Sequence, residues 1–421
     1  MPELTTAPPA TRPRPRRPRR TTVLAFTALL SAGLVAVPGT TAVAVAELDE
    51  VVTWGACAAR VTGAVDGQTV RNIVHTSIGG PAARISLSNV FGDRPLTFDS
   101  VYVGVQADGA TVTPGTNTRV TFSGGHTSVT VPPGAEVLSD DMKIAVPADT
   151  NLAVSVHVVG ASGQITGHNF TAQTSYLSGA GDSAANESAA PFGTTINRWY
   201  WVDAVVVDAP ELVDTVAFLG DSITDGVGST PNANHRYPDY LADRLATRPV
   251  VQRFGIMNEG ISGNRVLADG AGVSAQARLD RDVLSQPDVK SVVLLEGIND
   301  IGGGQATSAD QIIAAYRQLI ARAHSADVCI IGGTLTPFEG ARPPYYTPEK
   351  DLIRKAVNEF VRTSGEFDSV IDFDAAMRDP ANPNRFLPAY DSGDHLHPKD
   401  AGYQAMANAI DLKQLNCRRS R

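Results

Sequence analysis

The distribution of apolar positions divides the chain near residue 209. In residues 47–209, short alternating or β-branched apolar runs recur at even spacing, with turn-rich pieces such as Gly79-Gly80-Pro81 between them and almost no helical period. This pattern predicts an all-β domain, either a sandwich or a jelly roll. The predicted strands are residues 69–76, 83–89, 100–106, 119–122, 128–131, 142–146, 152–159 and 199–207.

Residues 210–421 follow a different pattern. Short apolar runs alternate there with longer stretches whose apolar positions follow the helical period. Five such strands alternating with helices predict a parallel sheet in a three-layer α/β/α domain. The strands are expected at 216–219, 254–257, 292–295, 328–331 and 370–373, and the helices near 238–247, 274–284, 308–324, 348–362 and 398–410.

Polar residues follow the predicted strands of this second domain. Ser222 follows the first strand, the turn Ser262-Gly263-Asn264 follows the second, and Asn299 follows the third. Asp394 and His397 come after the last strand with the spacing D-x-x-H. Because the carboxyl ends of parallel strands share one edge of a sheet, we expect these distant segments to form a single site.

Four blocks of this region resemble the motifs of the SGNH hydrolases, also called the GDSL lipase/esterase family. The blocks are GDSITDG, NEGISGN, EGIND and DHLHP, in the order the family has them, over about half of the chain. The resemblance implies a flavodoxin-like sheet, Ser222 as the nucleophile, His397 as the general base and Asp394 as the acid that orients it. It also implies three oxyanion donors: the backbone N–H groups of Ser222 and Gly263, and the side-chain amide of Asn299. The β-rich segment looks like the domain that precedes the hydrolase in secreted bacterial relatives.

These residue types suit ester hydrolysis on chemical grounds as well. A serine hydroxyl attacks an ester poorly unless an imidazole takes its proton, and a carboxylate must fix the tautomer of that imidazole. An acid and a histidine three residues apart on one turn can meet directly. The tetrahedral intermediate carries an oxyanion, and losing one of its donors costs about 3 kcal/mol in other hydrolases. The sequence therefore predicts a serine esterase that works through an acyl-enzyme and needs no cofactor.

The triad candidates have alternative roles. Ser222 could merely cap a helix, but the three partner blocks favour a nucleophile. His395 could be the base, yet it is adjacent to Asp394, and neighbouring side chains diverge. His397 is therefore favoured.

Several acids near these blocks could suggest a metal site. Asp221, Asp225 and Asp300 are of the type that binds hard cations, but such residues also accept hydrogen bonds in turns and at strand ends. We expect no metal there. Glu296 and Asn264 are expected to support the site rather than to react.

The first 46 residues resemble an export signal. A Pro/Arg-rich opening precedes an apolar stretch at 23–37 and a small-residue cleavage site, Ala42-Val43-Ala44 or Ala44-Val45-Ala46. The pair Arg19-Arg20 also permits a twin-arginine route. The apolar stretch is shorter than the roughly 20 residues that a bilayer needs, so a retained anchor is disfavoured. We expect a secreted, extracellular protein with no stable membrane anchor.

Charge and cysteine content refine this picture. The 421-residue chain has a formal net charge of −9, and removing an arginine-rich leader would make it more negative, which argues against nucleic acid as a partner. Of the three cysteines, Cys329 and Cys417 are both expected at the bottom of the sheet. A Cys329–Cys417 disulfide is therefore preferred over three buried thiols.

The substrate is less constrained than the reaction. An acylated, most simply acetylated, carbohydrate is the first choice, because a β-domain beside the catalytic domain could present polysaccharide and the aromatic content is only 6%. A lipid or lysophospholipid esterase is the alternative, and a polysaccharide-binding protein with a vestigial hydrolase domain is the alternative from another class. Trp199 and Trp201 could stack on sugars, but core or interdomain packing is favoured. The upstream histidines, which show no metal-ligand spacing, are interpreted as structural or exposed: His75, His126, His157 and His168.

Overall fold

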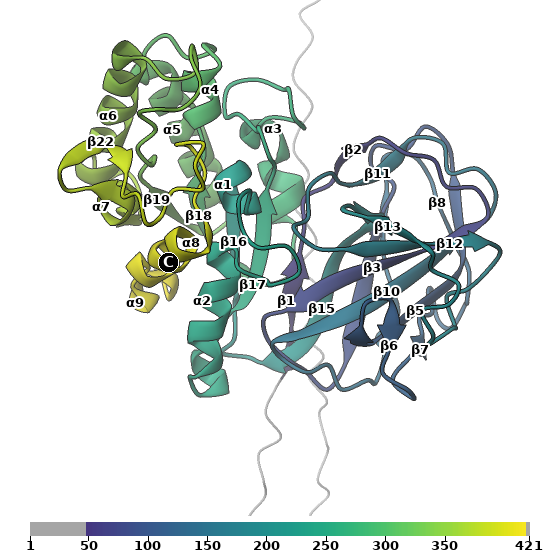
Figure 1. Cartoon of the computed structure of the whole chain (residues 1–421). Helices are drawn as coiled ribbons and strands as arrows, with labels where there is room; N and C mark the ends of the chain where they lie inside the picture. The colour runs from purple at the N-terminus through teal and green to yellow at the C-terminus, as the bar shows by residue number, and fades with distance from the viewer. Residues whose placement is uncertain (1–47, 418–421) are drawn as a thin grey trace, which may run out of the picture. The chain divides into compact units, whose positions relative to one another are not determined.

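Five parallel strands form the sheet predicted for the second half of the chain (Figure 1). The computed structural model describes residues 48–417, which lie in one compact unit. The strand order is β17-β16-β18-β19-β20. The second strand of this sheet along the chain, β17, is therefore the edge strand next to the first, β16, as in flavodoxin-like folds. The three-layer prediction is confirmed. The strands are β16 (Thr215–Gly220), β17 (Gly255–Gly260), β18 (Val289–Leu295), β19 (Cys329–Gly333) and β20 (Ser369–Ile371).

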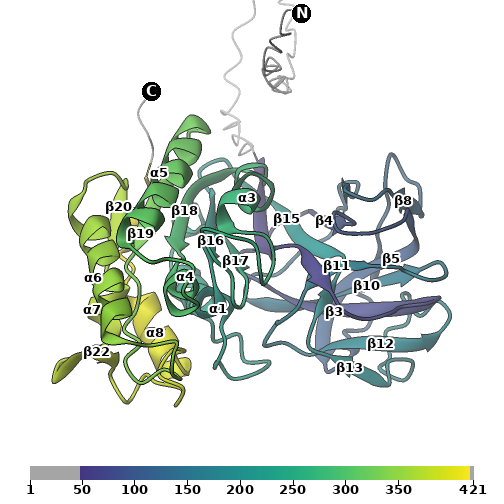
Figure 2. The same cartoon turned by 90° about the horizontal axis from the view of Figure 1, so that it is seen from above.

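Helices cover both faces of this sheet (Figure 2). Helix α2 packs with α8, while α5 packs with α3 and α6. Each long helix begins where the sequence supplies a cap: Ser308 forms a capping box with Gln311, and the Thr347 side chain accepts from Lys350 N. The five predicted helices correspond to α2 (Tyr237–Ala246), α3 (Ala275–Leu279) continued by the π-turn η2 (Asp280–Leu284), α5 (Ala309–Ser325), α6 (Pro348–Thr363) and α8 (Asp400–Ala409).

Several short elements were not predicted. A single turn of helix is too short for a periodic signal, so only tertiary contacts reveal it. Residue 373, assigned to the last predicted strand, instead begins a helix capped by Asp372. The short elements are α1 (Ser222–Asp225), η1 (Val250–Gln252), α4 (Ile298–Gly302), α7 (Phe373–Met377), α9 (Leu412–Leu415) and the hairpin of β21 (Arg378–Asp379) and β22 (Asn382–Phe386).

The upstream region is built from antiparallel sheets that share one apolar core. One sheet has the order β1-β15-β4-β9, a second is built on β13-β12-β3-β10-β5-β6, and a third is β14-β11-β2. The strands are β1 (Leu48–Gly55), β2 (Ala59–Val61), β3 (Gln68–Thr76), β4 (Ala83–Ser88), β5 (Leu96–Asp108), β6 (Thr111–Val112), β7 (Thr118–Arg119), β8 (Val129–Val131), β9 (Glu136–Leu138), β10 (Thr150–Val158), β11 (Ile165–His168), β12 (Ser175–Ala180), β13 (Thr194–Ile196), β14 (Trp199–Tyr200) and β15 (Val202–Pro210).

Three strand predictions in this region differ from the structure. The run 119–122 is a strand only at Arg119, with an isolated bridge at Phe122. The run 199–207 is broken at Trp201, whose φ of 62° is incompatible with a strand, so it forms β14 and β15 instead. The run 142–146 makes only isolated bridges at Met142 and Val146. The tryptophans are packed inside as expected, with Trp199 4% and Trp201 0% exposed.

Strand β1, which the apolar pattern did not reveal, lies against the edge of the parallel sheet. Val52 N donates to Thr215 Oγ1 at 3.0 Å, and Ala56 makes a parallel bridge to Asn258 in β17. Ser77 Oγ accepts from Ile256 N at 2.9 Å. The upstream β-region therefore packs directly against the strand that carries the NEGISGN block.

Three sequence predictions concern the ends of the chain and its cysteines. Cys329 and Cys417 form a disulfide, as predicted, and Cys57 is a buried free thiol. Among the described residues no helix is long and apolar enough to cross a membrane. The predicted export signal lies outside the described residues.

Candidate active site

Ser222 stands at the first position of a one-turn helix directly after β16. Asp221 caps that helix by accepting from Ile223 N at 3.0 Å, and Gly226 ends it with a φ of 97°. The turn lies tightly on the sheet, since a Cβ at Gly220 would come within 2.7 Å of the Leu295 carbonyl oxygen in the neighbouring strand. The GDSITDG block is therefore a sharp strand-to-helix turn that presents Ser222 at the carboxyl edge of the sheet.

The structure brings Ser222, His397 and Asp394 into one hydrogen-bonded row. Ser222 Oγ lies 2.7 Å from His397 Nε2, and His397 Nδ1 lies 2.6 Å from Asp394 Oδ2. The His397 side chain is 14% exposed and that of Asp394 is 51% exposed. One imidazole thus joins a hydroxyl and a carboxylate, which is the geometry that proton transfer from a serine requires.

The local turn holds Asp394 in its ionised form. Its Oδ1 accepts from the backbone N–H groups of Leu396 and His397 at 2.9 and 2.8 Å. Partial burial by itself raises the pKa of Asp394, but the hydrogen bonds from His397 and from these N–H groups outweigh it, so the pKa lies well below its usual range. A carboxylate that is ionised at neutral pH therefore faces Nδ1 and keeps the proton on that nitrogen.

The residues matched to oxyanion donors lie in loops tied to this turn. Gly263 has a φ of 81°, in the left-handed region where glycine is favoured. A Cβ at Gly260 would lie 2.3 Å from Asp225 N, so the second block runs against the nucleophile turn. Asn299 Nδ2 donates to the Asn264 carbonyl oxygen at 2.9 Å, which links the third block to the second.

A phenol fixes the orientation of the Asn299 amide. The Tyr345 hydroxyl donates to Asn299 Oδ1 at 2.8 Å, so this oxygen is occupied and the amide nitrogen faces the Asn264 carbonyl. An amide whose oxygen is held in this way presents its second N–H as a donor. No sequence motif indicates Tyr345, which comes from the loop before α6.

The acids considered as metal ligands make hydrogen bonds with protein groups instead. Asp300 accepts from Val266 N and Leu267 N, both at 2.9 Å, and Asp225 accepts from Ser262 N. In the described part of the chain, the only acid and cysteine side chains grouped closely enough to share a metal ion are Cys329, Asp368 and Cys417. Two of these three are joined in the disulfide and cannot act as thiolate ligands.

Two buried carboxyls stand behind the nucleophile. Burial raises the pKa of Asp221 to about 7, although the hydrogen bond from Ile223 opposes the shift. Glu296 is fully buried, its Oε2 has no partner among the described residues, and burial raises its pKa well above the usual range. Neither carboxyl joins the row formed by Ser222, His397 and Asp394.

The remaining candidates take supporting places. His395 pairs with Asp391, at 2.5 Å between Nδ1 and Oδ2, and is half-exposed. Asn264 donates to two loop carbonyls and accepts from Arg278 Nε at 3.0 Å. The fully buried Arg278 also donates to the Gly220 carbonyl oxygen at 2.9 Å, so one guanidinium ties the first and second blocks together. No sequence pattern indicates the role of Arg278, because arginines on amphipathic helices are usually exposed.

The site contains a serine, an imidazole and a carboxylate in hydrogen-bonded order, and it lies at the carboxyl ends of the strands of a three-layer fold. This combination defines a serine hydrolase. Residues 218–405 match the GDSL-like Lipase/Acylhydrolase family. This part of the chain belongs to that family, and the protein is an ester hydrolase. No curated protein matches the chain.

Solved structures resemble the same half of the chain. Axe2, an acetylxylan esterase from Geobacillus stearothermophilus, is 26% identical with a TM-score of 0.37, and the alignment covers 49% of this chain and 97% of that one. A GDSL-like lipase from Bacteroides thetaiotaomicron VPI-5482 is 20% identical with a TM-score of 0.35, over 46% of this chain and 84% of that one. The family assignment rests on the match over residues 218–405.

Proposed function

We propose that this protein is a secreted serine esterase that cleaves carboxylic esters through an acyl-enzyme on Ser222. The observation that carries the mechanism is the continuous row from Ser222 Oγ through His397 to Asp394, with distances of 2.7 and 2.6 Å. The export part of the proposal rests on the leader-like first 46 residues.

The reaction follows from this geometry in two steps. His397 Nε2 takes the hydroxyl proton as Ser222 Oγ attacks the ester carbonyl, and Asp394 stabilises the imidazolium that forms. The oxyanion accepts from the N–H groups of Ser222 and Gly263 and from the Asn299 amide. The intermediate then expels the alcohol, which receives the proton from His397. Water, deprotonated by the same imidazole, attacks the acyl-enzyme and releases the acid.

For the substrate we propose an acylated carbohydrate, most simply an acetyl ester. The β-region packs against β17, the strand that leads into the site, where it would present polysaccharide. A lipid or lysophospholipid esterase is the alternative.

The proposal also includes the domain boundaries and the fold of the β-region. The β-region would form its own domain, residues 47–209, ahead of a hydrolase domain at 210–421. The antiparallel sheets of the β-region around one core support a sandwich fold. The more specific topology that we propose for it is a jelly roll.

The mechanism is tested with a short nitrophenyl ester and the variant Ser222→Ala. Loss of the attacking oxygen should lower kcat by at least about 10⁴-fold, because triad members act as a unit. A Ser325→Ala variant at the exposed end of α5 keeps the nucleophile and serves as the matched control. Turnover by Ser222→Ala at the wild-type rate would overturn the proposed nucleophile, and absence of turnover by the wild type would favour the vestigial-hydrolase alternative.

The substrate class is tested by comparing acid release from two kinds of ester. Acetate released from acetylated xylan or pectin should exceed fatty acid released from a lysophospholipid, as measured by kcat/KM. A preference for the long chain would reject the carbohydrate proposal while leaving the mechanism intact.

A further inference from the structure

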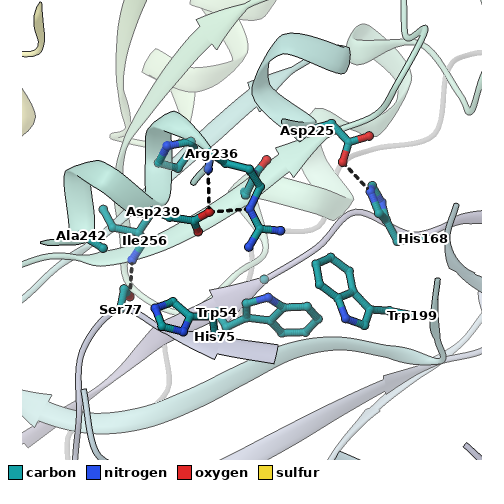
Figure 3. A pocket seen from close by; sticks show the side chains of 13 residues that line it. Trp54, His75, Ser77, His168, Trp199, Asp225, Arg236, Asp239, Ala242 and Ile256 are labelled. Carbon is teal, nitrogen blue, oxygen red and sulfur yellow. Dashed lines mark hydrogen bonds and ion pairs between the residues drawn. The ribbon is translucent and has the colours of Figure 1, made fainter. Parts of the chain in front are cut away.

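A histidine of the β-region contacts the nucleophile turn. His168, at the end of β11, is 4% exposed, and its Nε2 lies 2.8 Å from Asp225 Oδ1. Figure 3 shows the two side chains pointing toward one another across the boundary between the β-region and the hydrolase. Asp225 is the last residue of α1, the helix that begins at Ser222.

The second oxygen of Asp225 holds the oxyanion loop. Asp225 Oδ2 accepts from Ser262 N at 2.9 Å and from Ser262 Oγ at 2.5 Å. Ser262 immediately precedes Gly263, whose N–H is the second proposed oxyanion donor. One carboxylate therefore connects a β-region histidine, through one oxygen, with the turn that positions Gly263, through the other.

The surroundings of His168 fix its ring and its charge. Its Nδ1 lies 3.3 Å from the Cys57 carbonyl oxygen and 3.4 Å from Cys57 Sγ, so both ring nitrogens have polar partners. Burial by itself lowers the pKa of His168, but the Asp225 carboxylate outweighs it and the pKa lies well above its usual range. The neighbouring Cys57 Sγ donates to the Gly260 carbonyl oxygen at 3.0 Å, a second contact of the β-region with the NEGISGN block.

The space beside this pair excludes a substrate-binding role. A cavity of about 20 Å³ is lined by His168, Asp225, Trp199 and Arg236, which is enough for about one water molecule and no more. Trp199 packs on the His168 ring with centroids 5.6 Å apart. The histidine is thus held in place from the β-region side.

From this geometry we propose that His168 is a positioning residue for the esterase reaction. It holds Asp225, and Asp225 holds Ser262 so that the Gly263 N–H points at the oxyanion. The β-region then completes the active site rather than serving only as a separate substrate-binding module. This inference rests on the proposed function, in which Gly263 donates to the oxyanion.

The first experiment compares three variants of the full-length protein with wild type, using a nitrophenyl acetate assay. His168→Leu removes the donor, and His168→Gln retains an N–H near the position of Nε2. His157→Leu is the matched control, because His157 is also a β-region histidine paired with an aspartate, at 2.6 Å from Asp99. Activity is measured well below the thermal midpoint of each variant.

We expect His168→Leu to lower kcat by about 10-fold or more with little change in KM, because a displaced oxyanion donor acts on the transition state. His168→Gln should recover most of that loss, and His157→Leu should stay within about 2-fold of wild type. Equal kcat for His168→Leu and His157→Leu would overturn the proposal, even if the thermal midpoint of His168→Leu fell.

A double-mutant cycle with Ser262→Ala tests the connection through Asp225. If His168 and Ser262 act through the same carboxylate, the loss in the double variant should be clearly smaller than the product of the two single losses. Independent, multiplicative losses would overturn the connection. Activity of wild type together with inactivity of Ser222→Ala establishes the proposed function separately, so its failure cannot be mistaken for failure of this inference.

Discussion

Side chains from inside and outside the motif blocks set the geometry of the proposed oxyanion site. Asn299 comes from the third block, but its amide is oriented by the Tyr345 hydroxyl at 2.8 Å. Asn264 and Arg278 hold the second block against the first. The proposed triad and oxyanion donors could be located in the sequence, whereas the contacts that support them link residues far apart in the chain and follow no local pattern.

Replacing Tyr345 with phenylalanine should impair catalysis without disturbing the fold. The change removes only the hydroxyl that holds Asn299 Oδ1, so the amide can rotate and the oxyanion loses a fixed donor. We expect kcat to fall about 10-fold with KM nearly unchanged, less than the roughly 10²–10³-fold loss for a deleted donor. Tyr346→Phe is the control, since the Tyr346 hydroxyl contacts Glu339 instead. Equal kcat in the two variants would contradict this role for Tyr345.

At the scale of elements, the carboxyl ends and the amino ends of the parallel strands have separate roles. The carboxyl ends of β16, β17 and β18 lead into the site, whereas Cys329 at the start of β19 is bonded to Cys417, just after α9. A four-residue helix such as α9 is not stable alone and depends on tertiary contacts. Leu415 supplies one such contact by burial, and the disulfide supplies the other.

Removing the disulfide should therefore lower stability and leave the chemistry intact. The two cysteines are separated by 88 positions, so the bond restricts a long loop of the unfolded chain. We expect Cys329→Ala/Cys417→Ala to lower the free energy of unfolding by about 2–5 kcal/mol, measured by guanidinium denaturation. The kcat of the double variant at 25 °C should equal that of wild type, because the disulfide lies at the amino ends of the strands, opposite the site. A lowered kcat with unchanged stability would contradict this division of tasks.

At the scale of the whole molecule, the β-region and the hydrolase bury ionisable groups between them. His168 and Asp225 pair across this boundary. On either side of it, Asp203 in β15 is partly buried and Glu259 in β17 is 3% exposed, and burial raises the pKa of each well above its usual range. Buried carboxyls of this kind favour the protonated form and penalise ionisation.

Stability should consequently fall as pH rises from about 5 to 8. A carboxyl whose pKa is higher in the folded state than in the unfolded chain keeps its proton only when folded. The folded state then binds more protons, and stability decreases with pH until the folded pKa is passed. For Asp221, with a pKa of about 7, the full effect is on the order of 4 kcal/mol.

Thermal unfolding in buffers of equal ionic strength checks this dependence. The midpoint should be about 3 °C or more higher at pH 5.5 than at pH 8, and Asp221→Asn should flatten the profile. Below about pH 4 the trend should reverse, because the pKa values of Asp394 and Asp400 are lowered in the folded state and their protonation costs stability. A midpoint that rises between pH 5.5 and 8 would contradict the prediction.

The sequence by itself determined the order of the strands and helices in the second half and the residues at their ends. Period and length distinguish a buried strand from a helix, and parallel connectivity forces Ser222, Gly263, Asn299 and His397 to one edge. The same reasoning placed the disulfide at the other edge. Short, locally encoded signals sufficed for each of these inferences.

Only the tertiary structure revealed which contacts support the site at the carboxyl ends of the strands. Strand β1 packs along β17, and His168, which has no distinguishing spacing in the sequence, reaches Asp225 in the nucleophile turn. Packing between regions depends on surfaces assembled from many distant residues, so no local pattern encodes it. The burial of His168 and the polar partners of its two ring nitrogens turn an ordinary histidine into the candidate link between the β-region and the active site.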